Sequence, residues 1–207
     1  MRQADRTRRS TEALLDAAGD LIVERGFGAL TLAAIGERAG FSRGLVTARF
    51  GSKHGLIDAL LDRIFVRWEQ AKDEPGSESL CGRDRIVRMI GAIHSSYLLD
   101  PASSRVLWAL MFEAIGPDEA LRLRIVQFHD QLRDELAGYL ERGLADGSVR
   151  HGVDPLAEAV QLLAEVRGLA YQAMLEPDRF DLHQALTYAE QVLLDRLGPQ
   201  TVPVVGR

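Results

Sequence analysis

The sequence predicts an all-α protein of about nine helices. Apolar residues recur at intervals of three and four along nearly all of its 207 residues, which is the period of an amphipathic helix. Glycine, proline and small polar residues that cap or end helices separate these stripes. The sequence contains no alternating run of convincing strand length, no internal repeat and no low-complexity tract.

The first three predicted helices follow one another closely. The first ends near Gly26, where a helix C-cap is expected, and its stripe consists of Leu14, Ala17, Ala18, Leu21 and Ile22. Thr31 is the expected N-cap of a short second helix that ends at Gly40. Ser42 then caps a third helix that runs to about Phe50.

Longer helices are predicted after Ser52, which caps the fourth. The clearest linker, Glu74 to Ser77, separates the fourth from the fifth. Asp154 and Pro155 suit the N-cap and first residue of the eighth helix. The turns that end the fifth, sixth, seventh and ninth helices are Asp100-Pro101, Gly116-Pro117, Asp146-Gly147 and Gly198-Pro199.

Composition limits the function classes. Cys81 is the only cysteine, which excludes an intrachain disulfide and a cysteine-rich zinc module. No apolar run approaches the roughly 20 residues that span a bilayer, and the N-terminus lacks the apolar core of a secretory signal. The five histidines are not paired at metal-ligand spacing. We therefore expect a cytoplasmic protein with no membrane segment, no metal site and no cofactor.

Charge is divided unevenly along the chain, whose net charge is −5. Residues 1–53 contain nine Lys and Arg against six Asp and Glu, a net charge of +3, which leaves −8 for the rest. A basic head on an acidic body suits a protein that binds phosphate at one end. A solvated charged face explains the asymmetry equally well.

Residues 31–53 have the length and turn chemistry of a helix-turn-helix. Phe41, Val46 and Phe50 are expected to anchor the third helix to the core, which leaves its other face for the major groove of DNA. Arg43 is the best candidate for bidentate hydrogen bonds to guanine. Gly44 permits close approach to the groove.

The remaining expected contacts are to phosphates and to one base. Leu45 is expected to touch a thymine methyl, and Thr47, Arg49 and Lys53 to contact phosphates. Helix N-termini bind anions, so the expected DNA-binding set also includes Thr31 and Ser42. The arginines Arg6, Arg8 and Arg9 suit a flexible arm along the backbone or in the minor groove.

At these residues the sequence resembles the TetR family of bacterial one-component regulators. The matching elements are ALLDAAGDLIVERGF in the first helix, the threonine that opens the second, IGERAGFS, RGLV, FGSK and the following leucine. RGLAYQAMLEP at 167–177 also resembles the end of the eighth helix in many members. The resemblance implies a homodimer formed through helices at about 155–175 and 180–197, a ligand pocket in the C-terminal part, and repression relieved by the ligand.

We therefore expect a helix-turn-helix DNA-binding domain at 1–53, a larger helical effector-binding and dimerisation domain at 54–200, and a tail at 201–207. The helix at 54–72 links the two domains and is the expected route of coupling.

The chain departs from the family at three positions. Thr47 stands where tyrosine is often found, and Arg49 where histidine or tyrosine is frequent. Whether these two residues replace the usual phosphate contacts stays open at this point. Gly36 replaces the usual alanine and is expected to weaken the second helix by roughly 1 kcal/mol.

A small-molecule effector is expected to meet aromatic side chains with a few polar groups, the lining of an apolar pocket. For any one of these residues on its own, ordinary core packing is the better explanation. The expected effector-binding residues are Tyr97, Trp108, Met111, Phe112, Phe128, His129, Arg167 and Tyr171.

Three alternatives remain. An activator of the same fold differs from a repressor only in where its operator lies. A helical adaptor that has lost DNA binding would lack the cations of the third helix. An enzyme is disfavoured, because the sequence has no glycine-rich phosphate loop, no G-x-S-x-G elbow and no metal-ligand cluster.

Overall fold

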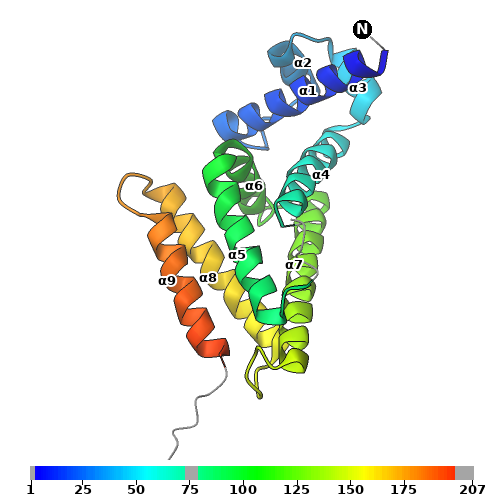
Figure 1. Cartoon of the computed structure of the whole chain (residues 1–207). Helices are drawn as coiled ribbons and strands as arrows, with labels where there is room; N and C mark the ends of the chain where they lie inside the picture. The colour runs from blue at the N-terminus through cyan, green and yellow to red at the C-terminus, as the bar shows by residue number, and fades with distance from the viewer. Residues whose placement is uncertain (1–2, 73–78, 199–207) are drawn as a thin grey trace, which may run out of the picture. The chain divides into compact units, whose positions relative to one another are not determined.

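The computed structural model describes residues 3–72 and 79–198, which form nine α-helices and no strand (Figure 1). The all-α prediction is therefore confirmed. The helices are α1 Gln3–Arg25, α2 Leu32–Ala39, α3 Arg43–Phe50, α4 Lys53–Lys72, α5 Gly82–Leu99, α6 Pro101–Glu113, α7 Glu119–Asp146, α8 Pro155–Leu175 and α9 Leu182–Leu197. The predicted linker at 74–77 and tail at 201–207 lie outside the described residues.

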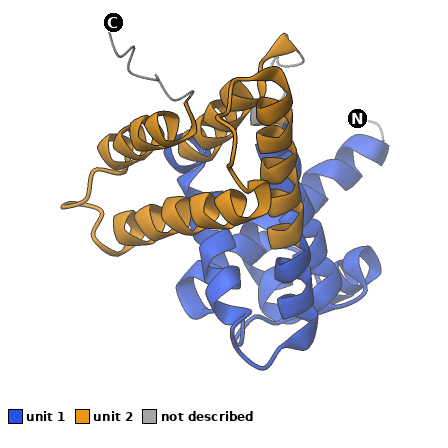
Figure 2. Ribbon diagram, turned by 90° about the horizontal axis from the view of Figure 1, so that it is seen from below, with its two compact units in different colours: residues 1–69, 96–127 blue, residues 70–95, 128–207 orange. Residues whose placement is uncertain are grey.

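The chain packs into two compact units (Figure 2). Unit 1 comprises the described residues of 1–69 and 96–127, and unit 2 those of 70–95 and 128–207. The long helices α5 and α7 therefore contribute to both units. The expected domain boundary after residue 53 stays a prediction. None of the described helices is long and apolar enough to cross a membrane.

The predicted N-caps are confirmed by hydrogen bonds within three residues of each cap. Thr31 Oγ1 accepts from the amide of Ala34 at 3.1 Å, and Ser42 Oγ accepts from the amide of Leu45 at 3.2 Å. Ser52 and Asp154 accept backbone amides at the starts of α4 and α8 in the same way. Each cap satisfies amides that have no partner inside the helix.

Helix α1 begins at Gln3, so the arginines expected in a flexible arm, Arg6, Arg8 and Arg9, lie in regular helix instead. No glycine or proline interrupts residues 3–18, and an acidic residue lies in the first turn, where the helix dipole favours it. Absence of a helix breaker therefore extends α1 by more than three turns before its first fully buried residue, Leu14.

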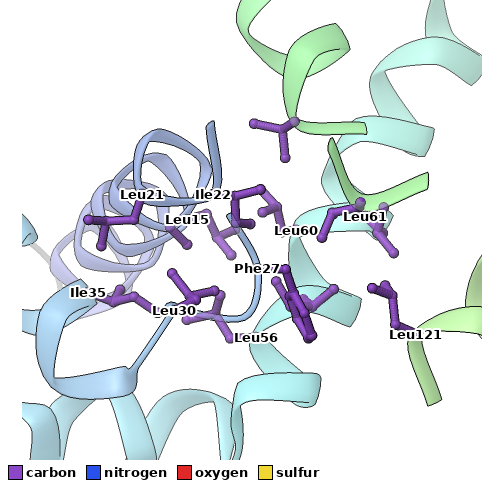
Figure 3. Packing of buried hydrophobic residues seen from close by; sticks show 14 of the residues in the cluster. Leu15, Leu21, Ile22, Phe27, Leu30, Ile35, Leu56, Leu60, Leu61 and Leu121 are labelled. Carbon is purple, nitrogen blue, oxygen red and sulfur yellow. The ribbon is translucent and has the colours of Figure 1, made fainter. Parts of the chain in front are cut away.

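One apolar core holds unit 1 together. Helices α1, α2, α4 and α7 point leucine and isoleucine side chains toward one another (Figure 3). In α3, Val46 is completely buried, and Phe50 is partly buried against the same core. Phe41 was expected to join them but is 36% exposed, because it lies in the turn before the Ser42 N-cap. Two side chains, not three, therefore anchor α3 to the core.

Unit 2 depends on a close approach of α5 to α7 at Gly82. The Gly82 amide donates to Asp146 Oδ2 at 2.8 Å. A Cβ atom on Gly82 would lie 2.1 Å from the backbone nitrogen of Gly143 and 2.4 Å from the carbonyl oxygen of Tyr139. Only glycine fits here, since the neighbouring atoms belong to a helix backbone that cannot move aside.

We predict that Gly82→Ala lowers the free energy of unfolding by about 2–3 kcal/mol, because the added methyl group overpacks the α5–α7 contact. Chemical denaturation followed by circular dichroism measures this loss. Gly91→Ala in α5 is the matched control: its Cβ would meet no atom within 4 Å, and alanine favours helix over glycine by about 0.8–1 kcal/mol. Equal stabilities of the two variants would contradict the close approach.

Candidate functional site

The outer face of α3 is open. Ser42, Arg43, Gly44 and Thr47 are exposed, and Leu45 is partly exposed. Within the described part of the chain, Arg43 has no side-chain hydrogen bond or ion pair. The predicted groove-facing residues of α3 are thus brought together on one short helix, at the end where unpaired amides and the positive end of the helix dipole also lie.

The turn before α3 explains Gly36. The Phe41 amide donates to the Gly36 carbonyl at 2.7 Å, and Gly40 has a φ of 76° in the left-handed region. A Cβ on Gly36 would lie 2.8 Å from the Phe41 carbonyl oxygen. Gly36 therefore permits the start of α3 to approach α2, a contribution that its low helix propensity alone does not reveal.

Arg49 leaves α3 in a different direction from Arg43. Its Nη1 donates to the Thr7 carbonyl at 2.9 Å and to Thr11 Oγ1, and its Nη2 donates to Ser10 Oγ at 3.4 Å. The guanidinium therefore joins α3 to the N-terminal part of α1. Its predicted phosphate contact stays a prediction.

Lys53, the last expected DNA contact, is also bonded within unit 1. Its Nζ donates to the Phe27 carbonyl at 2.5 Å and lies 3.8 Å from the centre of the Phe27 ring. Partial burial lowers the pKa of the ammonium group, against the opposing effect of the carboxylates of Asp118 and Glu113. Thr31, by contrast, is exposed at the start of α2.

Sequence reasoning missed two sets of ionic contacts, which join α1 to α2 and to α4. Arg38 in α2 donates to both carboxylate oxygens of Glu24 in α1, at 2.9 and 2.6 Å. Arg63 in α4 donates to Asp16 at 2.7 Å and to Glu12 at 3.1 Å, both in α1. The partners are 14 to 51 residues apart in sequence, and no local pattern indicates such pairs.

Helix α4 has further polar contacts on its other sides. His54 Nε2 lies 3.0 Å from both carboxylate oxygens of Asp118, which in turn caps the start of α7. Arg124 in α7 pairs with Asp62 and lies 3.7 Å from Asp58, both in α4. Within unit 1, α4 is thus tied to α1 and to α7.

The expected effector residues fall into two groups. Unit 1 contains Tyr97, Trp108, Met111 and Phe112, and unit 2 contains Phe128, His129, Arg167 and Tyr171. In unit 1 the Trp108 indole donates to the Tyr97 hydroxyl, and the rings of Trp108 and Phe112 lie 5.7 Å apart. These three residues therefore form a continuous aromatic cluster with one exposed member, Phe112.

A hollow of about 410 Å³ lies within unit 1 among α1, α4 and α6. Apolar residues, among them Leu60 and Val106, and charged residues such as Asp20 and Arg105 line it. None of the eight expected effector residues belongs to its lining. In the described part of the chain, no group of three or more side chains is arranged to hold a metal ion.

Among the expected effector residues of unit 2, His129 has a strongly shifted pKa and an unpaired buried nitrogen. Its Nε2 is buried and has no hydrogen-bond partner among the described residues. Burial, followed by the charges of Arg167 and Arg133, lowers the pKa of the imidazole to about 4, while Asp130 opposes them. The ring is therefore neutral at pH 7 and keeps one buried nitrogen for a further hydrogen bond.

Two family models match the chain. Residues 14–60 match the model of bacterial regulatory proteins of the tetR family, and residues 82–198 match the C-terminal model of BetI-type transcriptional repressors. Among curated relatives, the transcriptional regulator TtgR of Pseudomonas putida is 27% identical over 181 residues, 82% of each chain. The repressor KstR2 of Rhodococcus jostii is 29% identical over 158 residues, 70% of each chain.

Solved structures share the fold. The SmeT–triclosan complex has a TM-score of 0.77 at 24% identity and covers 96% of each chain. NalD of Pseudomonas aeruginosa has a TM-score of 0.76 at 21% identity, over 93% of this chain and 98% of that one.

We predict that His129 makes stability fall with acid. Because its folded-state pKa of about 4 lies below the ordinary 6.5, the unfolded chain takes up the proton first as pH falls. The contribution is fully present above pH 6.5 and lost by about pH 4, and we expect roughly 1–2 kcal/mol after solvent screening.

His129→Gln removes this titration, so the difference in unfolding free energy between wild type and variant is expected to change between pH 7 and pH 4. Denaturation curves at a series of pH values measure it. His151→Gln, at an exposed turn position, is the control. The assignment is wrong if His129→Gln and His151→Gln show the same pH dependence.

Proposed function

Because this chain belongs to the TetR family of transcriptional regulators, we propose that it is a repressor that binds operator DNA as a homodimer and leaves it when a small molecule binds. Membership makes the protein a DNA-binding transcriptional regulator and not an enzyme. The observation that carries the proposal is the bare outer face of α3, with Arg43 unengaged in the described structure. An activator acting from a different operator position would use the same face.

We assign direct base contacts to the N-terminal half of α3. Arg43 reaches guanine, Gly44 permits close approach, and Leu45 touches a thymine methyl. The exposed residues Thr31, Ser42 and Thr47 contact phosphates, the first two with free amides behind them. Lys53 adds positive charge at the start of α4, where it is partly buried.

The homodimer is proposed to form through α8 and α9. Leu162, Leu163 and Val166 face the core of unit 2, yet a second apolar stripe stays exposed. This exposed stripe consists of Leu156, Val160, Tyr171 and Leu175 in α8, with Tyr188 and Val192 in α9. Exposed apolar residues at helical spacing on neighbouring helices suit a two-fold interface.

The effector is proposed to be an apolar, drug-sized molecule. The aromatic cluster of Tyr97, Trp108 and Phe112, all in unit 1, supplies stacking surface for such a ligand. The solved complex of SmeT contains triclosan, which makes this compound a suitable first probe.

We predict that the protein binds a selected operator with an affinity that falls steeply with salt, since released counterions drive binding. Fluorescence anisotropy with sequences selected from a random DNA pool measures it. Arg43→Ala is expected to weaken specific binding by about 1–3 kcal/mol and to relax the preference at one base pair. Arg105→Ala removes the same charge from an exposed position in α6 and is expected to leave affinity unchanged.

Two outcomes decide between the parts of this proposal. Wild-type binding without sequence preference or salt dependence would reject the regulator mechanism. Equal operator affinity with and without saturating triclosan, and then with a wider set of aromatic compounds, would reject the proposed effector class while leaving DNA binding intact.

We predict that Val160→Glu dissociates the homodimer, because a carboxylate in an apolar interface loses its hydration without gaining a partner. Sedimentation at micromolar concentration is expected to give a dimer for wild type and a 22.9 kDa monomer for the variant. Leu123→Glu, an exposed leucine of α7 outside the stripe, is the control and stays dimeric. A wild-type monomer would contradict the interface.

A further inference from the structure

The inner face of α1 changes character toward the N-terminus. From Leu14 onward it is apolar and buried, whereas Thr7, Ser10 and Thr11 continue the same face at helical spacing with hydroxyl groups. Residues 3–13 are all exposed or only partly buried, whereas Leu14 is fully buried. The apolar core therefore does not hold the first turns of α1.

Arg49 covers this hydroxyl face. Its guanidinium donates to the Thr7 carbonyl at 2.9 Å, to Thr11 Oγ1 and, at 3.4 Å, to Ser10 Oγ. The hydroxyls are themselves held, since Ser10 Oγ and Thr11 Oγ1 each donate to the Thr7 carbonyl at 2.9 Å. A planar group with a fork of donors is thus bonded to three acceptors on one helix face.

The turns held in this way are basic. Residues 3–9 contain Arg6, Arg8 and Arg9 against Asp5 alone, and all three arginines are exposed. At about 100° per residue, Arg6 and Arg8 project to either side of Thr7, the residue in contact with α3. The N-terminal end of α1 lies beside α3 (Figure 1). Three outward-facing arginines are therefore carried next to the recognition helix on a rigid support.

We propose that Arg49 is a positioning residue for DNA binding. It fixes the first turns of α1 to α3, so that Arg6 and Arg8 contact operator phosphates as part of one rigid body with Arg43. This inference rests on the proposed function, and it replaces a direct phosphate contact by Arg49 itself. A fixed helix binds phosphate with less loss of conformational entropy than a mobile arm.

Two variants separate positioning from direct contact. Arg49→Gln removes the guanidinium, while the double variant Ser10→Ala with Thr11→Val removes two acceptors and changes no charge. If Arg49 positions α1, both weaken operator binding about tenfold and lower the slope of log affinity against log salt by about 2, at 0.9 per phosphate lost. If Arg49 binds phosphate directly, Arg49→Gln lowers the slope by about 1, the double variant leaves it unchanged, and the inference is overturned.

A further test uses variants of the α1 arginines. Arg6→Gln with Arg8→Gln is expected to lower the salt slope by about 2 in the wild-type background and to have no further effect in Arg49→Gln, because the contacts are already lost there. Additive losses in the two backgrounds overturn the inference.

The rate of trypsin cleavage after Arg6, Arg8 and Arg9 in the DNA-free full chain measures how firmly the first turns of α1 are held in the folded structure. Arg49→Gln and the double variant Ser10→Ala with Thr11→Val, the two clamp variants, are expected to be cleaved at least tenfold faster than wild type, since cleavage requires local unfolding. Arg43→Ala is expected to be cleaved at the wild-type rate. Wild-type cleavage rates in the clamp variants overturn the inference. If the wild-type protein binds no DNA, both the proposed function and this inference are wrong. If the wild-type protein binds DNA normally and the clamp variants bind it equally well, only this inference is wrong.

Discussion

Burial of one face of α4 is the constraint on which unit 1 depends. Leu56, Ile57, Leu60 and Leu61 are each no more than 2% exposed, in a core shared with α1, α6 and α7. Full burial of such a side chain contributes about 1.5–3 kcal/mol, so the four together outweigh any set of surface contacts. The three N-terminal helices are therefore joined to α6 and the start of α7 by a core and not by a linker. A change that tilts α4 must carry the recognition helix with it.

Ionic contacts around α4 contribute more to its orientation relative to α1 and α7 than to the stability of unit 1. Arg63 reaches α1, and Arg124 reaches α4 from α7, with side chains only 14% and 21% exposed, while their carboxylate partners are 49% to 66% exposed. Pairs of this kind typically contribute about 0–1 kcal/mol each. The two sets of pairs lie on different sides of α4, so together they fix the orientation of the helix against α1 and α7, while the buried core supplies most of the stabilisation.

Features that depend on neighbouring residues along the chain were predicted correctly from the sequence. The caps at Thr31, Ser42, Ser52 and Asp154 bond amides two or three residues away, and all were predicted. Prediction was wrong where long-range packing decides. Phe41 is apolar yet exposed in its turn, and no local pattern indicates the contact between Arg49 of α3 and the first turns of α1, whose partners are 38 to 42 residues apart. The expected effector residues share a composition, but composition does not record that they belong to two separately packed units.

The two arginines of α3 show how little residue type alone says about a DNA contact. Arg43 and Arg49 are six residues apart, so they leave the helix in directions about 120° apart. Arg43 meets solvent, whereas Arg49 meets the carbonyl and hydroxyl oxygens of α1. The long side chain of arginine spans that gap, and its planar fork of donors matches the acceptors on α1. A count of cations on the recognition helix therefore does not record that one of its two arginines is bonded to α1 and not exposed to solvent in the same way as the other.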